Sequence, residues 1–415
     1  MISVEEAVAA TLAGVEPLAG TETLALPDAI DRVLAADLHA DRDQPPFPAS
    51  AMDGYAVRAS DAKAGAILRL VDESRAGHAA QRSLGEGEAI RIFTGAPVPE
   101  GADAILIQEN ARADGERIFV EKEVEPGRYL RPRGFDIAAG SIVGVAGTVV
   151  DAGLATLLAT TGLARVPVRT RPIVAIVATG DELVPLGETP GPAQIVASSP
   201  YGVGALLASA GATTYQAGIA ADTKASLHET FDRAEARGAV LVVTLGGASV
   251  GDHDLVGPVL RERGVEMAFE KVAMRPGKPL MHGRDGQRLY LGLPGNPVSS
   301  LVCARVFGQP LVAKLAGRPH AHDWRIGRLG RDLAENDERE EFMRAHVHSD
   351  EDGAIVTPFD RQDSSLVATY AAAEALVHRP ARAAAARAGN PCRYIPLRPS
   401  PIRHAERLRS GSEPA

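Results

Sequence analysis

Residues 173–183 read Ile-Val-Ala-Ile-Val-Ala-Thr-Gly-Asp-Glu-Leu, an apolar run that ends in glycine and two carboxylates. A strand that is apolar on both faces is typical of a parallel sheet with helices on both sides. Beyond it, strand-like and helix-like segments alternate: strands are expected near residues 213–219, 239–243, 267–272 and 288–293, and helices after Pro200, at 223–237, at 255–263 and from Pro297. This alternation predicts a three-layer α/β domain over residues 171–316.

Local signals outside this domain predict further helices and strands. Ser3 and Glu6 form a capping box that begins a helix, and a second helix is capped by Asp151 and closed by Gly162. Short apolar runs between turn residues predict small mostly-β domains. The expected organisation is residues 1–40 with 138–170 as an N-terminal linking domain, 41–137 as a mostly-β domain, the α/β domain, 325–400 as a C-terminal β domain, and 401–415 as a disordered tail.

Composition narrows the classes of protein. The 415 residues are 45% hydrophobic and 23% charged, as in soluble globular proteins, and the net charge of -9 argues against a nucleic-acid partner. No apolar run reaches the roughly 18 residues that a membrane span needs. Two cysteines are too few for a disulfide framework, and no secretory signal opens the chain, so we expect a cytoplasmic protein.

Unusual loops follow three of the expected parallel strands. Ligands bind at the carboxyl ends of strands in open α/β sheets, and glycines there let backbone N–H groups approach an anion. Glycine at one strand end is more often only a turn, but three such loops at one edge favour a binding site. The candidate binding residues in these loops are Thr179, Gly180, Gly246, Gly247, Ser249, Pro294, Gly295, Asn296, Pro297 and Ser299, with Asn296 also expected to cap the last helix.

Charged residues accompany these loops. Residues 271–279 place Lys271, Arg275 and Lys278 in a segment with two prolines and a glycine, which favours a rigid loop that binds phosphate or another tetrahedral oxyanion over a solvated basic loop.

Four carboxylates converge on the same edge, and magnesium binding and helix capping are equally open for them: Asp181, Glu182, Asp252 and Asp254. His253 between the last two is best explained as a lone surface histidine, and Cys303 as a core residue. The chain has no Walker loop, nucleophile elbow or zinc signature.

The mostly-β domain carries polar turns of its own. Residues 45–56 are rich in proline and display Ser50, Asp53 and Tyr55, while residues 94–99 and 131–137 have a similar character. A rigid turn explains the shape of these segments but not the polar side chains that they carry.

Five of these segments resemble the motifs of the molybdopterin molybdenumtransferases, the family that includes the gephyrin E domain. They are Pro-Ala-Ser-Ala-Met-Asp-Gly-Tyr-Ala (48–56), Thr-Gly-Asp-Glu-Leu (179–183), Gly-Gly-Ala-Ser-Val-Gly-Asp-His-Asp (246–254), Lys-Val-Ala-Met-Arg-Pro-Gly-Lys-Pro (271–279) and Leu-Pro-Gly-Asn-Pro-Val-Ser-Ser (293–300). They occur in the family's order, and the resemblance spans residues 1–400.

The resemblance implies an enzyme that inserts molybdate into adenylated molybdopterin and releases AMP with the help of Mg²⁺. It also implies an elongated homodimer whose site joins the α/β domain of one subunit to the small β domain of the other. Further partners would be the adenylyltransferase and the molybdoenzymes that accept the cofactor.

The family's functional residues are matched here by three groups of side chains. The first group, the polar residues of the β domain, is Asp53, Thr94 and Asp136. The second group is acidic and consists of Glu182, Asp222, Asp252 and Asp254; all of these except Asp222 are candidate metal ligands. The third group is the cations Lys271, Arg275 and Lys278. Asp53, Glu182, Asp222, Asp252, Lys271 and Lys278 are the candidate catalytic residues. Pro294 and Pro297 are expected to shape the loop that closes over the ligand.

This sequence departs from the family's pattern at two places. An Asp-x-Asn segment often follows the Gln-Ile pair, but here Ser198 and Ser199 stand in that region, which puts ligand recognition there in doubt. A Gln-Gly-Ser-Gly pattern is replaced by Gln-Asp-Ser-Ser at residues 362–365, where we expect little effect on activity. Alternative functions remain open: a molybdopterin adenylyltransferase, a non-enzymatic scaffold, or insertion of tungstate.

Overall fold

The computed structural model describes residues 1–247 and 254–398, which fold as two compact units. One unit comprises Met1–Gly20 and the chain from Arg169 onward, and the other is Thr21–Val168. Ser249, Asp252 and His253 lie outside the described residues, as does the expected tail at 401–415.

A six-stranded sheet organises the first unit. Its order is β16–β13–β17–β21–β20–β18, and the first four strands are parallel. The strands are β13 (Ile173–Thr179), β16 (Thr213–Ala220), β17 (Leu241–Leu245), β18 (Glu266–Phe269), β20 (Met281–Arg284) and β21 (Leu289–Leu293). The expected fold class is therefore confirmed, although β18 and β20 are antiparallel to their neighbours, so the sheet is mixed.

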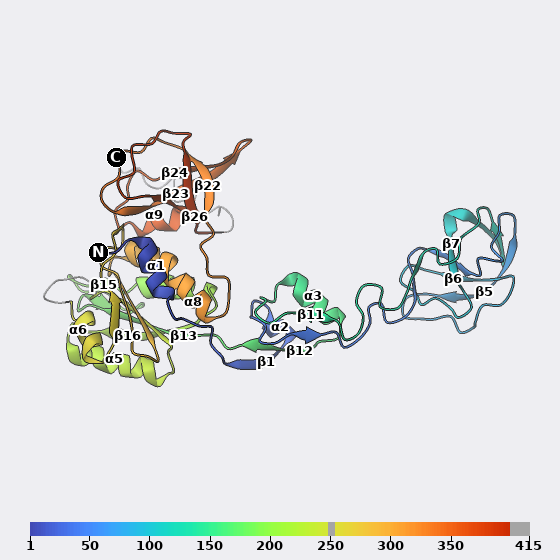
Figure 1. Ribbon diagram of the computed structural model, residues 1–415, viewed down its shortest axis with the longest axis horizontal. Coiled ribbons are helices and arrows are strands. Elements are labelled where there is room, and N and C mark those ends of the chain that lie inside the picture. The colour runs from blue at the N-terminus through green and yellow to red at the C-terminus, as the bar shows by residue number, and fades with distance from the viewer. Residues whose placement is uncertain (248–253, 399–415) are drawn as a thin grey trace. The chain divides into compact units, whose positions relative to one another are not determined.

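Helices cover both faces of this sheet, as Figure 1 shows. Val174 and Ile176 of β13 pack with one set of helices, while Ala175 and Val177 pack with the other, because successive side chains of a strand point to opposite faces. The first set is α1 (Val4–Leu12), α4 (Ser199–Ser209), α7 (Pro297–Cys303) and α8 (Gln309–Leu315); the second is α5 (Lys224–Ala236) and α6 (Val256–Glu262).

Capping residues set the helix starts as the sequence predicts. Ser3 and Glu6 form a complete capping box at α1, and Asp151 accepts the N–H of Leu154 at 2.8 Å at the start of α3 (Ala152–Thr160). The chain from Pro297 to Leu315 is helical throughout, with a π-helical turn at Ala304–Gly308 between α7 and α8.

This stretch is the one described helix long and apolar enough to cross a membrane by length and composition, and 83% of its apolar 18-residue window is buried within the fold. Burial of this kind is typical of a core helix.

The C-terminal strands close into a ring within the first unit. The order β23–β24–β22–β26–β25 is completed by pairing of β25 with β23, and β19 extends the sheet from β23. The strands are β19 (Met274–Arg275), β22 (Arg325–Leu329), β23 (Glu340–Asp350), β24 (Gly353–Pro358), β25 (Ala375–Arg379) and β26 (Pro391–Pro396), with α9 (Val367–Ala372) in a connection. Because β19 belongs to the cationic segment, that segment is joined directly to the C-terminal sheet.

The second unit contains another six-stranded sheet, ordered β7–β4–β6–β5–β9–β8. Its strands are β4 (Gly54–Val57), β5 (Ile67–Ser74), β6 (Glu88–Ile92), β7 (Ala104–Ile107), β8 (Ala111–Asp114) and β9 (Arg117–Val120). Two-stranded pairings complete the unit: β1 (Thr21–Ala25) with β12 (Arg165–Arg169), β2 (Leu38–His39) with β11 (Ile142–Gly144), and β3 (Ala49–Ser50) with β10 (Leu130–Arg131). The polar turn at residues 45–56 thus leads into β4.

Candidate functional site

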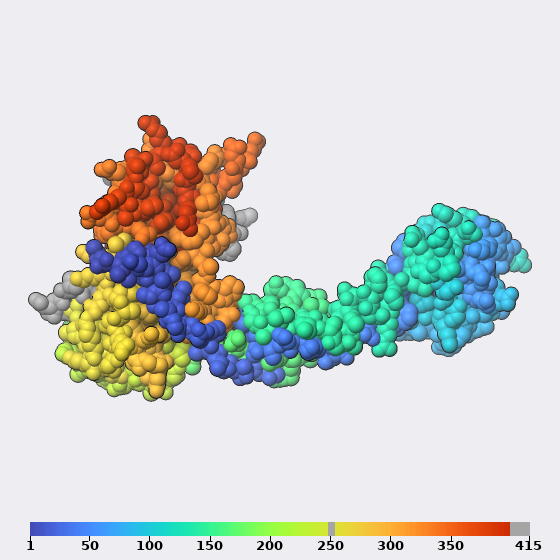
Figure 2. All heavy atoms as spheres, in the orientation of Figure 1, coloured from blue at the N-terminus to red at the C-terminus, as the bar shows by residue number. Residues whose placement is uncertain are grey.

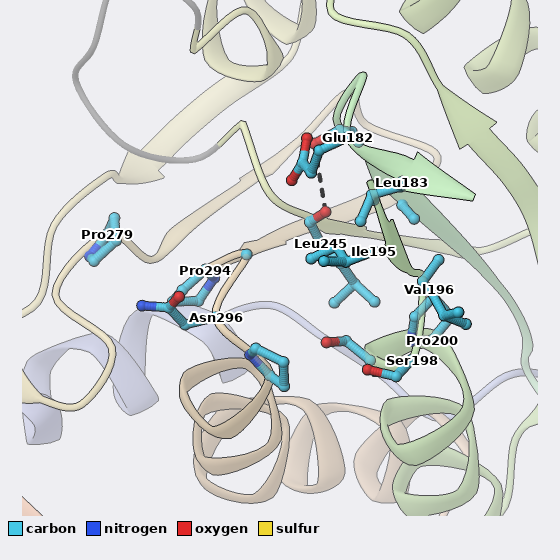
Figure 3. Close-up of a pocket in the computed structure, with 16 residues that line it drawn as sticks. Glu182, Leu183, Ile195, Val196, Ser198, Pro200, Leu245, Pro279, Pro294 and Asn296 are labelled. Atoms are coloured by element: carbon cyan, nitrogen blue, oxygen red, sulfur yellow. Dashed lines mark hydrogen bonds between the residues drawn. The ribbon is translucent and has the colours of Figure 1, made fainter. Parts of the chain in front are cut away.

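A cavity of about 410 Å³ lies at the carboxyl ends of β13, β17 and β21. These strands are adjacent and parallel, so Thr179, Leu245 and Pro294 meet at one edge of the sheet. Figure 3 shows the lining residues around one space, with Glu182 above it and the starts of α4 and α7 below it. The three strand ends meet at this edge as expected, but of the second loop only Leu245 lines the cavity among the described residues, and the role of the edge as a binding site stays a prediction.

Glycines bring the backbones of these loops close together. Gly246 has φ of 103°, and a Cβ built there would lie 2.6 Å from the hydroxyl oxygen of Thr179. A Cβ on Gly295 would lie 3.5 Å from the Cα of Gly246. Gly180, with φ of 143°, has the side chain of Glu182 folded against it. The N–H groups of Gly180 and Gly246 are already donated to the carbonyls of Ala220 and Leu293, at 3.2 and 3.1 Å, so these two glycines serve mainly the close packing of the loops.

The third loop begins α7 and also contacts the C-terminal domain. Asn296 occupies the N-cap position with Pro297 at the first turn, as expected. Its side chain does not cap the helix; instead Nδ2 donates to the hydroxyl of Ser364 at 3.0 Å. Ser299 is buried in the first turn of α7. Pro294, Gly295, Asn296 and Pro297 line the cavity, whereas Ser299 does not.

The cationic segment reaches the same cavity through Pro279, which lines it directly after Lys278. Lys278 is exposed and Lys271 is half-buried. The guanidinium of Arg275 lies 2.7 Å from Glu341 and 3.2 Å from Asp337, and the hydrogen bonds that it donates to Glu341 raise the pKa of Arg275. Arg275 therefore holds the C-terminal domain in this structure, and its role in substrate binding stays a prediction.

The acidic residues are distributed around the strand ends. Glu182 lines the cavity, and the carboxylate of Asp181 accepts the backbone N–H of Asp222 at 3.0 Å just beyond β16. Asp254 lies one residue before Leu255, which holds the N-cap position of α6, and no side chain among the described residues caps that helix. Within residues 1–247 and 254–398, no cluster of three histidine, cysteine or carboxylate side chains could hold a metal unaided. Asp252, a candidate ligand and catalytic residue, lies outside those ranges, as does Ser249.

The second unit pairs two of its predicted residues. Asp53 accepts hydrogen bonds from the backbone N–H of Thr94 at 2.7 Å and from its hydroxyl at 2.8 Å. The backbone bond, the hydroxyl bond and the charge of Arg91 lower the pKa of Asp53. Asp136 is exposed, and its N–H donates to the carbonyl of Gln44 at 2.9 Å. Thr94 thus holds the carboxylate of Asp53 in place and favours its ionised form.

Several residues near the site carry a weaker signal in the sequence. Ser198 and Ser199, the positions of the first departure, both line the cavity. Ser364, from the second departure, lies against Asn296 at its rim. Arg344 is fully buried in β23, and its Nε and Nη1 have no hydrogen-bond partner among the described residues. No local pattern marks Arg344. The side chain of Gln362, from another segment, accepts the backbone N–H of Arg344 and donates to its carbonyl, each at 2.9 Å.

A second cavity of about 360 Å³ adjoins the first. The two share Ala178, Leu183, Ala197 and Pro200, and the second extends toward β16 with Tyr201 and Gln216 in its lining. Together they form a recess that is large enough for a small-molecule ligand.

Family models match nearly the whole chain. They are the MoeA N-terminal region (domain I and II) over residues 2–162, a probable molybdopterin binding domain over 175–314, and the MoeA C-terminal region (domain IV) over 327–397. The second of these matches contains the cavity and the cationic segment.

Curated relatives and solved structures are similar to this chain over most of its length. A molybdopterin molybdenumtransferase of Bacillus subtilis is 34% identical over 87% of this chain and 86% of the relative. One from Nostoc sp. is 39% identical over 72% of this chain and 70% of that protein. A solved molybdopterin biosynthesis MoeA protein of Pyrococcus horikoshii matches with a TM-score of 0.82 and 27% identity, covering 96% of this chain and all of that one.

Proposed function

This chain belongs to the molybdopterin molybdenumtransferase family, transferases of molybdenum-cofactor biosynthesis, and we propose that its strand-edge cavity inserts molybdate into adenylated molybdopterin with release of AMP. The observation that carries the proposal is the meeting of Glu182, three glycine-containing strand ends and the end of the cationic segment around one cavity. Molybdate and phosphate are both tetrahedral oxyanions, so fixed cations and backbone donors suit either.

The cations have distinct roles in this proposal. Lys271 and Lys278 neutralise the oxyanions of molybdate and the phosphoanhydride, while Arg275 anchors their loop through Glu341. The backbone N–H groups that orient the phosphates belong to strand-end residues other than Gly180 and Gly246, whose N–H groups donate to Ala220 and Leu293. Such a site raises the reaction rate mainly by holding the reacting groups close together and correctly oriented.

Magnesium is part of the proposal, and the donor set fits it. The available side chains are carboxylates, which are oxygen ligands of the kind that Mg²⁺ prefers. Mg²⁺ commonly keeps waters and binds through one or two carboxylates plus substrate phosphate oxygens, so a single lining carboxylate such as Glu182 suffices on the described part of the chain. Asp254 and Asp252 are the other proposed ligands. Bound there, the ion would stabilise negative charge on the leaving phosphate.

The proposed assembly is a homodimer in the cytoplasm. Asp53, Thr94 and Asp136 are assigned to substrate contacts made from a second copy of the chain, and Asp222 to the acidic set of the first. Mixing Asp53→Ala chains with Lys271→Ala chains tests this assignment. In a hybrid dimer, one site would combine the intact Lys271 of one chain with the intact Asp53 of the other, so activity would return. The adenylyltransferase and the molybdoenzymes are the proposed suppliers and acceptors.

The experiment that tests the function supplies adenylated molybdopterin, Mg²⁺ and molybdate to the purified protein. We expect AMP release that depends on molybdate, and reconstitution of an apo-molybdoenzyme by the product. Consumption of ATP with unadenylated molybdopterin would instead identify an adenylyltransferase. No turnover of either substrate would identify a scaffold, and tungstate in place of molybdate tests the choice of oxyanion.

A further inference from the structure

The cationic segment lies between the N-terminal residues and the C-terminal domain. Ile2 and Val272 form a parallel bridge, in which the N–H of Ile2 donates to Lys271 at 3.3 Å and the N–H of Ala273 donates to Ile2 at 2.8 Å. On the other side, the N–H of Glu340 donates to the carbonyl of Ala273 at 2.9 Å. Figure 2 shows the first residues at the junction between the α/β layers and the C-terminal strands.

One carboxylate joins these flanking segments. Oε1 of Glu340 accepts the backbone N–H of Val4 at 3.1 Å, and Oε2 lies 2.8 Å from Nε2 of His378 on β25. The side chains of Glu340 and His378 are only 20% and 14% exposed. A hydrogen bond to a charged group in such a shielded place is stronger than one at the surface.

The two ends of the cationic loop are also bonded to each other. The N–H of Val272 donates to the carbonyl of Lys278 at 3.1 Å, which closes the loop between the two lysines. Any shift of Val272 against Ile2 or β23 is therefore passed to Lys271 and Lys278 together. Displacement of a binding group by about 1 Å is enough to cost a large part of a site's effect.

We propose that Glu340, acting through Val4 and the bridge at Ile2, is a positioning residue that sets the Lys271–Lys278 loop for oxyanion binding. This inference rests on the proposed function of those lysines. Glu340 does not touch the substrate; it joins α1, β19 and β25 at the base of the loop.

Glu374 supplies a matched control in the same domain. It is a buried glutamate whose carboxylate accepts the N–H of Val347 at 2.8 Å and lies 3.9 Å from His346, but the cationic segment has no part in these contacts. A merely structural effect of losing a buried carboxylate would appear in both variants, whereas a positioning effect is confined to Glu340.

The test compares Glu340→Ala, Glu340→Gln and Glu374→Ala by steady-state kinetics and by calorimetric titration with sodium molybdate. Glu340→Ala removes the hydrogen bonds to both Val4 and His378 and is expected to raise the KM for molybdate about tenfold through displacement of the loop, with kcat changed less than about twofold. Glu340→Gln, whose amide oxygen still accepts the N–H of Val4, should recover part of the loss. Glu374→Ala should leave the KM within about twofold of wild type.

Val4→Pro provides a second route that leaves the carboxylate in place. Val4 is the first residue of α1, where proline is tolerated; the substitution removes the N–H and replaces a buried apolar side chain by an apolar ring of similar size. Ser3 before it is already extended, with φ of -67° and ψ of 166°, as a residue before proline requires. The variant should raise the KM for molybdate in the same direction as Glu340→Ala.

The outcomes separate this inference from the function on which it rests. If Lys271→Ala and Lys278→Ala weaken molybdate binding but Glu340→Ala and Val4→Pro do not, the positioning role is wrong and the site stands. An equal rise in KM for Glu374→Ala also overturns it. If neither lysine variant changes molybdate binding, the roles assigned to the lysines fail, and the positioning role falls with them.

Discussion

Asn296 at the start of α7 donates a hydrogen bond from its side chain to the hydroxyl of Ser364, 3.0 Å away in the C-terminal domain. The N–H of Val298 also donates to the carbonyl of Ser364, at 3.2 Å. Because Asn296 lines the cavity, the loop at Ser364 fixes one side of its rim. The C-terminal domain, where the sequence suggests little effect on activity, therefore supports the site directly.

Ser364→Ala should raise the KM for adenylated molybdopterin a few-fold and lower the free energy of unfolding by up to about 1 kcal/mol, the usual value of one partly exposed hydrogen bond. Ser365→Ala is the control, because that hydroxyl bonds to Asp363 within the loop at 2.6 Å. Kinetics and urea denaturation measure the two effects. Equal KM values for the two variants would show that Ser364 does not shape the rim.

Gly246→Ala should be far more harmful than a comparable change in open space. Its Cβ would lie 2.8 Å from the carbonyl oxygen of Thr179, and its φ of 103° already disfavours a side chain. Gly264→Ala is the control, with φ of 81° and nothing within 4 Å of its Cβ. We expect Gly264→Ala to cost about 1 kcal/mol of folding free energy, and Gly246→Ala about 3 kcal/mol with loss of activity. Similar unfolding free energies would contradict the close packing of the strand ends.

Asp53→Asn should retain the fold of its unit while lowering AMP release at least tenfold, if the fixed negative charge serves the reaction. The amide oxygen can still accept from Thr94, so the substitution removes charge with little change of shape. Asp72→Asn is a matched control, since Asp72 also accepts backbone N–H groups in this unit. Circular dichroism measures whether the fold is retained, and the AMP assay measures activity. Full activity of Asp53→Asn would remove Asp53 from the candidate site.

The pH dependence of stability should report the Glu340 contact. Its hydrogen bond from His378, and then that from Val4, lower the pKa of Glu340 in the folded protein. A lowered folded-state pKa contributes stability above the unfolded value of about 4.3, and that stability is lost as the pH falls through the lower folded value. Below about pH 4.3 the melting temperature should thus fall more steeply for wild type than for Glu340→Gln. Parallel curves would mean that this carboxylate gains nothing from its partners on folding.

Much of the site's framework could be predicted from local sequence. The apolar run at β13, the capping box of Ser3 and Glu6, and the cap at Asp151 depend on neighbours within a few residues, and all three are present in the structure. The meeting of three strand ends follows from the parallel topology that the alternation predicts.

Long-range relationships could not be predicted in this way. Residues 281–284 read Met-His-Gly-Arg and carry no strand periodicity, yet they form β20 because the β21 edge is available for pairing. The ion pair of Arg275 with Glu341 joins residues far apart in sequence. Such contacts arise from tertiary packing, so the residues next to either partner in the sequence do not predict them.

The most direct test of the central claim, that an oxyanion binds at the strand-edge cavity, is anomalous diffraction from crystals soaked in molybdate. The account predicts a molybdenum peak inside the cavity lined by Glu182, Pro279 and Pro294, within reach of Lys278, and loss of that peak in Lys278→Ala crystals. A peak only at another place, or the same peak at full height in the variant, would contradict it.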